Sequence, residues 1–302
     1  MKRNRLDEMN NLALEKLNQG DFFEAQACFR ENTKEYPEAL CFNNLGVFYT
    51  TEGLLLKSGK VRKSLALGIK YLERARRLGV SSPKNLLALG SAYYDQGELE
   101  KAKNYFLKAI ELGEDAIAPY NLGVVQFLLR GYRVSTKYLE KSFEQSILDG
   151  KDMDESLVYV YSLINYDVSK GRNALEKVLA AKIPHIELDT FVLAYLCQEL
   201  TLAKSLVEDM FVSWAVPPVV MAMVFDCMFS LGLADEAKKY KVLQEKILGE
   251  YNYNARREIC EIRKIYMDKD YRDGLIKSYK FQPLLKRGCY YIGCKLHPEC
   301  NL

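Results

Sequence analysis

The sequence predicts an all-α protein: a right-handed superhelical solenoid of about seven helix-turn-helix repeats, closed by a C-terminal capping helix. Three observations support this fold. A Leu-Gly pair recurs, beginning at Leu45, Leu89 and Leu122. Apolar residues recur at spacings of three and four, as on one face of a helix, from near Arg5 to near Glu250. A single helix pair cannot bury its apolar face, so such units must stack.

The composition is that of a folded chain that is poor in histidine. Of 302 residues, 49% are hydrophobic and 27% are charged, and the formal net charge is only +3. These values exclude a disordered chain and give no reason to expect a polyanionic partner. General acid–base and metal-assisted catalysis draw first on histidine, and the chain has only 2. Phosphate-loop, nucleophile-elbow and zinc-protease motifs are also missing from the sequence. We therefore expect a protein that is not an enzyme.

The first two repeats show different parts of the pattern. The first unit is recognised mainly in its second helix, through Ala25, Phe29 and Pro37. The second unit begins near Ala39 and carries about ten extra residues between its helices. These extra residues predict an inserted loop near 51–63.

The third unit, from Pro83 to about Glu114, is the most complete. Small and large side chains alternate on the facing sides of its two helices, so the helices can approach closely while large residues fill the remaining space. A tight turn at Gly97 joins the two helices. The residues that carry this pattern are Leu89, Gly90, Tyr93, Ala102, Phe106 and Ala109.

The later repeats are progressively weaker. The fourth unit keeps Leu122 and Gly123. The fifth, sixth and seventh units rest on helical periodicity, with Ala174, Ala203 and Ala237 at their small-residue positions. The predicted solenoid therefore covers residues 1–250.

The order Leu-Gly, Tyr, Ala, Phe, Ala and Pro resembles the tetratricopeptide repeat. This resemblance implies a concave groove, lined by the first helix of each unit, that holds a peptide or a helix of a partner protein. In this family an asparagine just before Leu-Gly often faces the groove and binds a peptide main chain without selecting its sequence. Asn44 and Asn121 occupy that position, and Tyr94, Tyr120 and Phe127 lie near them on the first helices. These five residues are the expected peptide-binding groove.

Three functions remain open on this resemblance. The first is a scaffold that binds another protein or a peptide, and the second is a regulator that senses a short peptide. The third is an adaptor with a zinc- or redox-active tail. Family members that grip acidic C-termini use a clamp of Lys, Asn, Asn, Lys and Arg, of which only Asn44 and Lys84 are matched here. Two matching clamp residues of five cannot neutralise a terminal carboxylate, so acidic chaperone tails are not expected as ligands.

Residues 251–281 are expected to form the C-terminal capping helical region. Ile259, Ile262 and Tyr266 share one helical face, which would cover the last repeat. Between Arg256 and Glu299, eleven Lys and Arg residues oppose six Asp and Glu residues, so this segment carries +5. The acidic residues interrupt the basic run, and we do not expect nucleic acid to bind.

The last segment, residues 282–302, is a cysteine-rich tail. Cys289, Cys294, His297 and Cys300 are a donor set that could hold one tetrahedral zinc ion. Their spacing matches no zinc-ribbon or zinc-knuckle pattern. Zinc binding, thiol redox chemistry and an unspecialised tail therefore stay open, and no other cofactor is expected.

The sequence also bears on the compartment. The charged start of the chain lacks the apolar stretch of a secretory signal. The longest apolar run, Met210 to Phe225, is interrupted by Pro217 and Pro218, so it does not predict a membrane span. We expect a cytoplasmic protein with no membrane partner, and its oligomeric state is left open.

Overall fold

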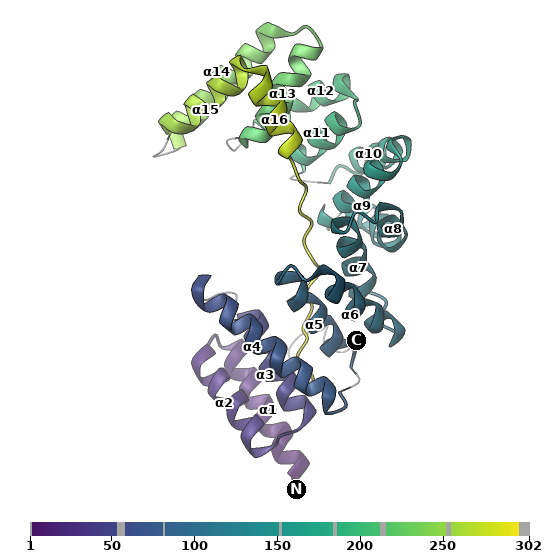
Figure 1. Cartoon of the computed structure of the whole chain (residues 1–302), viewed down its shortest axis with the longest axis vertical. Helices are drawn as coiled ribbons and strands as arrows, with labels where there is room; N and C mark the ends of the chain where they lie inside the picture. The colour runs from purple at the N-terminus through teal and green to yellow at the C-terminus, as the bar shows by residue number, and fades with distance from the viewer. Residues whose placement is uncertain are drawn as a thin grey trace. The chain divides into compact units, whose positions relative to one another are not determined.

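The structure is a computed structural model that describes residues 2–52, 58–80, 82–150, 153–183, 186–211, 216–251 and 255–295. Across these ranges the regular elements are sixteen α-helices, and there is no β-strand (Figure 1). None of the helices in the described ranges is long and apolar enough to cross a membrane. The all-α solenoid predicted from the repeats is confirmed.

The chain divides into two compact units. The first unit comprises residues 1–138 together with the C-terminal residues from Leu284 onward, and the second comprises residues 139–283. In the first unit, successive helices pack as pairs that stack on one another. Its helices are α1 (Lys2–Asn18), α2 (Phe22–Glu35), α3 (Ala39–Thr51), α4 (Ser58–Arg77), α5 (Pro83–Asp95), α6 (Leu99–Glu111), α7 (Ile117–Leu128) and the start of α8 (Tyr132–Asp149).

The pair α5 and α6 explains why the third repeat needs its small residues. Pro83 begins α5, where its missing N–H costs no helical hydrogen bond. The turn to α6 passes through Gly97 at φ +78, a conformation that glycine adopts without strain. A Cβ atom added at Gly90 would lie only 2.5 Å from the Phe106 ring. Glycine at this position therefore sets how closely the two helices approach.

The second pair differs from its expected form. α4 begins at Ser58, so the last part of the insertion expected near 51–63 is helical, and residues 53–57 lie outside the described residues. Leu65, Ile69 and Leu72 are buried at spacings of four and three, which keeps one apolar face along this helix. Gly46 of α3 permits the close contact, because a Cβ there would lie 2.8 Å from the Leu72 main-chain nitrogen.

The start of α7 is held by one carboxylate. Glu114 accepts hydrogen bonds from the main-chain nitrogens of Ile117, at 2.9 Å, and of Ala118. These N–H groups have no partner inside the helix, and a negative charge there also suits the helix dipole. The cap orients the first turn of α7, which carries Tyr120 and Asn121 into the site described below.

The second unit continues the helix pairs. After the rest of α8, its helices are α9 (Met153–Tyr166), α10 (Val168–Ala181), α11 (Glu187–Leu196), α12 (Leu200–Met210), α13 (Pro218–Ser230), α14 (Ala234–Tyr251), α15 (Ala255–Met267) and α16 (Lys269–Ser278). The expected capping region is thus two helices, because Asp268 accepts a hydrogen bond from the Tyr271 nitrogen and starts α16. Both helices pack on α13, where Tyr266 meets the edge of Phe225 at 5.4 Å.

Candidate functional site

The groove of the first unit holds the chain's own C-terminal segment. We use "the C-terminal segment" for residues 284–294 and "the groove" for the surface of α1, α3, α5 and α7 that it contacts. Figure 1 shows the chain after α16 as an extended trace. The C-terminal segment has no helix or strand and forms a turn at Ile292 and Gly293. Three of its side chains, Tyr290, Tyr291 and Cys294, are buried and belong to the core of the first unit.

Asn44 on α3 grips one end of the C-terminal segment. Its Oδ1 accepts a hydrogen bond from the Ile292 nitrogen at 2.8 Å, and its Nδ2 donates to the Ile292 carbonyl at 2.9 Å. The same Nδ2 also donates to Asn10 Oδ1 on α1 at 2.7 Å, which fixes the orientation of the amide. Asn44 has no exposed surface, so water does not compete with these hydrogen bonds.

Asn121 on α7 grips the other end in the same way. Its Oδ1 accepts from the Lys286 nitrogen at 2.8 Å, and its Nδ2 donates to the Lys286 carbonyl at 2.9 Å. Lys286 and Ile292 are six residues apart, about 20 Å in extended chain. Each asparagine amide thus acts as a short piece of strand, pairing with both main-chain groups of one residue. Such pairing does not depend on the side chain of the bound residue.

Further polar contacts hold the main chain beside these two grips. Asn43 donates from Nδ2 to the Tyr290 carbonyl at 3.2 Å. Asn85 on α5 donates from its Nδ2 to Asn43 Oδ1 at 3.0 Å. The Tyr120 hydroxyl donates to the Leu284 carbonyl at 3.1 Å. Four residues of the C-terminal segment therefore have a main-chain carbonyl bound by a side chain of the groove.

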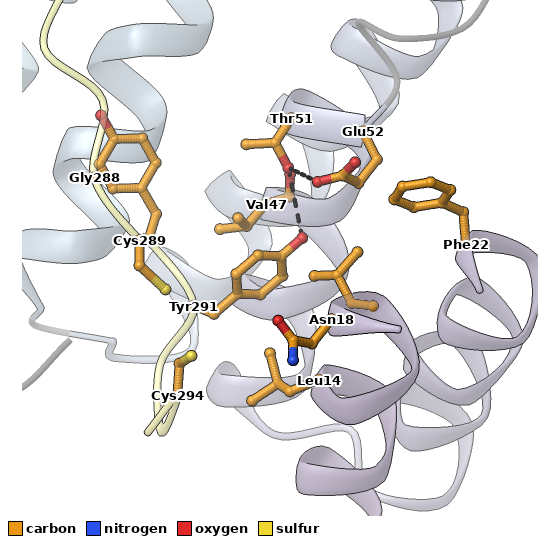
Figure 2. Close-up of a pocket in the computed structure, with 12 residues that line it drawn as sticks. Leu14, Asn18, Phe22, Val47, Thr51, Glu52, Gly288, Cys289, Tyr291 and Cys294 are labelled. Carbon is orange, nitrogen blue, oxygen red and sulfur yellow. Dashed lines mark hydrogen bonds between the residues drawn. The ribbon is translucent and has the colours of Figure 1, made fainter. Parts of the chain in front are cut away.

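The two adjacent tyrosines of the C-terminal segment enter separate pockets. The Tyr291 ring stacks on Phe29, with 5.7 Å between ring centroids, and its hydroxyl lies 3.5 Å from Thr51 Oγ1 (Figure 2). The Tyr290 hydroxyl lies 3.1 Å from Ser91 Oγ. Burial raises the pKa of both tyrosines above the ordinary value, because the phenolate would lose its hydration. The pockets therefore accept aromatic rings in the neutral form.

Arg287 and Gly288, which precede the two tyrosines, contact Asp95 on α5 and Ile117 on α7. Arg287 pairs with Asp95 on α5 at 2.5 Å, through Asp95 Oδ1. The other oxygen, Asp95 Oδ2, is buried without a hydrogen-bond partner. At Gly288 an added Cβ would lie 2.7 Å from Ile117 Cδ1, so the main chain passes close to α7 at this point. A basic residue followed by glycine suits this part of the groove.

A cavity of about 400 Å³ remains beside the C-terminal segment. It lies between α1, α2, α3 and the C-terminal segment, with Leu14, Val47 and Phe22 among its apolar walls (Figure 2). Glu52 also faces it, and burial raises the pKa of this carboxyl. Cys289 lines the cavity, so the C-terminal segment leaves room there for a larger side chain.

The five residues expected to line the groove have different surroundings in the structure. Asn44, Asn121 and Tyr120 all bind the main chain of the C-terminal segment. Phe127, at the end of α7, packs edge-on against Tyr132 at 5.6 Å. Tyr94 is half-buried on α5, and burial raises its pKa. Binding of a partner by any of the five stays a prediction.

The proposed zinc ligands lie only partly within the described residues. Cys289 and Cys294 lie in the groove, whereas His297 and Cys300 lie outside the described residues. In the described part of the chain, no three His, Cys, Asp or Glu side chains are grouped so that they could hold a metal ion. The zinc hypothesis is therefore not tested by the structure.

Several functional residues are missing from the sequence-based prediction. Asn43 and Ser91 have no distinguishing pattern, and Asp95 is one of many acidic residues at a helix end. Asn10 stands where the five-residue clamp has lysine, and no sequence pattern marks it as a contact of the C-terminal segment. The largest omission is the C-terminal segment itself, whose one signal was the pair Tyr290-Tyr291 within a basic, cysteine-rich tail.

Stacked helix pairs define the first unit as an α-solenoid, and the chain's own C-terminal segment lies along their first helices. Residues 83–116 match the family model of the tetratricopeptide repeat. Residues 83–116 are thus similar to a tetratricopeptide repeat, as the pattern around Leu89 and Gly90 predicted. A comparison with curated protein sequences gives no match.

Solved structures share this fold. A tetratricopeptide repeat protein from Parabacteroides merdae is 15% identical, with a TM-score of 0.57, over 87% of this chain and 99% of that one. MamA protein is 20% identical over 59% of this chain and 93% of its own, with a TM-score of 0.49. PilF of Pseudomonas aeruginosa is 17% identical over 87% and 99%, with a TM-score of 0.45. At these identities the comparison supports only a shared fold. That conclusion rests on the Parabacteroides merdae protein, whose TM-score is 0.57.

Proposed function

We propose that this protein is an interaction scaffold whose groove binds an extended segment of a partner protein. The observation that carries the proposal is the pair of asparagine grips. Asn44 and Asn121 each bind both main-chain groups of one residue, and the two bound residues are six apart. This geometry suits an extended chain of about seven residues and places no demand on the side chains at the two gripped positions.

The grips also favour an internal segment over a free peptide end. Lys286 and Ile292 are bound through N–H and C=O groups that every internal residue except proline has, whereas a free terminus would bring a full charge. A free terminal carboxylate would need cationic donors, and the groove contacts of Asn10, Asn43 and Asn44 come from neutral amides. We therefore favour a scaffold for protein segments over a regulator that senses a short free peptide.

A peptide selection tests this proposal. The full chain with Tyr290→Ala and Tyr291→Ala, which removes the two buried rings of the C-terminal segment, would be used to select binders from a displayed library of random 12-residue peptides. Selected peptides would then be synthesised with blocked termini and measured by fluorescence anisotropy. We expect blocked peptides to bind, and we expect binding to weaken at least about tenfold when Asn44→Ala and Asn121→Ala are added, because each grip loses two hydrogen bonds of about 1 kcal/mol.

Asn104→Ala is the matched control, because Asn104 is an exposed asparagine on α6. It should leave the affinities unchanged. Peptides that bind equally well with and without Asn44 and Asn121 would contradict the proposal. Peptides that bind only with a free terminus would instead support the peptide-sensing regulator.

A further inference from the structure

The C-terminal segment occupies the groove as a ligand would, and its side chains meet features that select among sequences. This inference rests on the proposed function and names the partner's chemistry. Along the segment, Arg287 pairs with Asp95, Gly288 passes Ile117, and Tyr290 and Tyr291 enter the two aromatic pockets. The two asparagine grips set where these residues lie along the groove.

Each of these contacts excludes other side chains for a physical reason. Asp95 Oδ1 accepts a hydrogen bond from Arg287, and Asp95 Oδ2 is buried without a hydrogen-bond partner. A guanidinium that donates to both oxygens would give the carboxylate a full set of partners. A Cβ at Gly288 would lie 2.7 Å from Ile117 Cδ1, so a side chain there requires this methyl group to move. Tyr290 and Tyr291 are 3% and 7% exposed, so a polar or small residue in their place would leave a pocket unfilled.

We propose that the partner of the groove is an extended protein segment with the pattern Arg-Gly-x-aromatic-aromatic, and that the C-terminal segment is its intramolecular competitor. The pattern places the arginine on Asp95 and the aromatic pair in the pockets at Ser91 and Phe29. The position marked x is that of Cys289, which lines the cavity of about 400 Å³. A partner with a larger apolar residue there fills space that the C-terminal segment leaves empty.

Competition follows from the covalent connection. The C-terminal segment is covalently joined to the groove through residues 139–283, so its rebinding is intramolecular and does not depend on protein concentration. A free peptide with the same contacts must therefore compete with a segment that is present in every molecule. The partner must make more contacts than the C-terminal segment does, or something must first release that segment.

The test uses the full chain and a labelled peptide of residues 283–295, kept reduced. Fluorescence anisotropy would compare the wild-type chain with the Tyr290→Ala/Tyr291→Ala variant, whose own C-terminal segment lacks the two rings. We expect the variant to bind the peptide at least about 100-fold more tightly than the wild type does. Addition of Asn44→Ala and Asn121→Ala should remove this binding, whereas Asn104→Ala should not.

Peptide variants test the pattern. Replacing both tyrosines by alanine, or Arg287 by alanine, or Gly288 by valine should each weaken binding at least about tenfold. Replacing Cys289 by leucine should strengthen it about threefold or more. If the native peptide and the double-alanine peptide bind the variant chain equally well, or if neither binds, the pattern is wrong.

Two further measurements keep the test decisive. Circular dichroism establishes that the variant chain is folded, and Gly288→Val in the chain offers a second way to release the C-terminal segment. Light scattering should give a monomer for the wild type. A dimer that dissociates on Asn44→Ala/Asn121→Ala substitution would assign the groove to the C-terminal segment of a second copy and overturn the intramolecular competitor.

Failure of this inference differs from failure of the proposed function. Asparagine-dependent binding of selected random peptides that lack the pattern would leave the scaffold function standing and reject the pattern. If the peptide of residues 283–295 binds but no selected random peptide binds in an asparagine-dependent way, the scaffold function is rejected. The C-terminal segment then remains only an intramolecular ligand of the groove.

Discussion

The side-chain amide of Asn44 pairs with both main-chain groups of Ile292, 248 residues further along the chain. It does for Ile292 what a neighbouring strand would do, in a protein whose described residues contain no strand. Because contacts of such sequence separation close a long loop, we expect them to form after the helix pairs, which depend on nearby residues. We therefore expect the C-terminal segment to leave the groove at a lower free-energy cost than unfolding of the helix pairs.

The Asn44–Ile292 grip predicts that Asn44→Asp releases the C-terminal segment. The carboxylate has nearly the same shape, but it cannot donate to the Ile292 carbonyl or to Asn10. A buried charge without its partners costs upwards of about 1–3 kcal/mol, equivalent to a factor of about ten or more in docking. The readout is alkylation of Cys294, which is 4% exposed when docked, followed site by site by peptide mass spectrometry.

Asn104→Asp introduces the same charge on the exposed face of α6 and is the control for this experiment. It should leave the alkylation rate of Cys294 as in the wild type. Exposed Cys260 should react quickly in every variant and calibrates the reagent. An unchanged Cys294 rate in Asn44→Asp would show that the amide grip does not hold the segment.

Gly90→Ala should destabilise the first unit. The added Cβ lies 2.5 Å from the Phe106 ring in a fully packed core, and overpacking of this kind costs about 1–3 kcal/mol. Denaturant unfolding followed by circular dichroism measures the loss. The same substitution at Gly249 on α14 meets no atom within 4 Å, so Gly249→Ala should instead stabilise by about 0.5–1 kcal/mol.

A double-mutant cycle identifies the cause of the Gly90→Ala effect. Phe106→Leu removes the ring atoms that the new methyl group would meet. In this background Gly90→Ala should be clearly less destabilising than in the wild type. Equal effects in both backgrounds would mean that the contact with the ring is not what requires glycine.

Alkaline pH should weaken docking of the C-terminal segment. Burial raises the pKa of Tyr290 and Tyr291, so the docked state favours the neutral phenols, whereas free tyrosines ionise near pH 10. Docking is therefore fully stable below about pH 10 and weakens as the pH rises above it. The titratable and charged groups that face the two tyrosines are Glu52, Asp95, Arg287, Cys289 and Cys294.

The measurement is the affinity of the 283–295 peptide for the Tyr290→Ala/Tyr291→Ala chain between pH 8 and about pH 10.5. A peptide with phenylalanine at both positions keeps the rings but cannot ionise there, so its affinity should fall less. Parallel loss of affinity by both peptides would assign the effect to other groups.

The helix pairs could be predicted from the sequence because their determinants are local. Leu89 and Gly90 lie one turn from Tyr93, and Phe106 follows within the next helix, so the spacing itself records which side chains meet. The same spacing placed Asn44 and Asn121 on first helices, where both bind a main chain. It did not reveal that α4 begins as early as Ser58, nor that the C-terminal cap has a second helix.

The occupant of the groove was decided only by the tertiary structure. Asn44 and Asn121 bind N–H and C=O groups that every internal residue except proline has, so these two contacts leave no sequence pattern at Lys286 and Ile292. The stacking of Tyr291 on Phe29 likewise joins two residues with no shared periodicity. The sequence by itself therefore determined the repeat, the first helices and their asparagines, because helical packing repeats at a fixed spacing. Only the folded chain determined what those asparagines hold, because a main-chain grip leaves no pattern in the side chains that it binds.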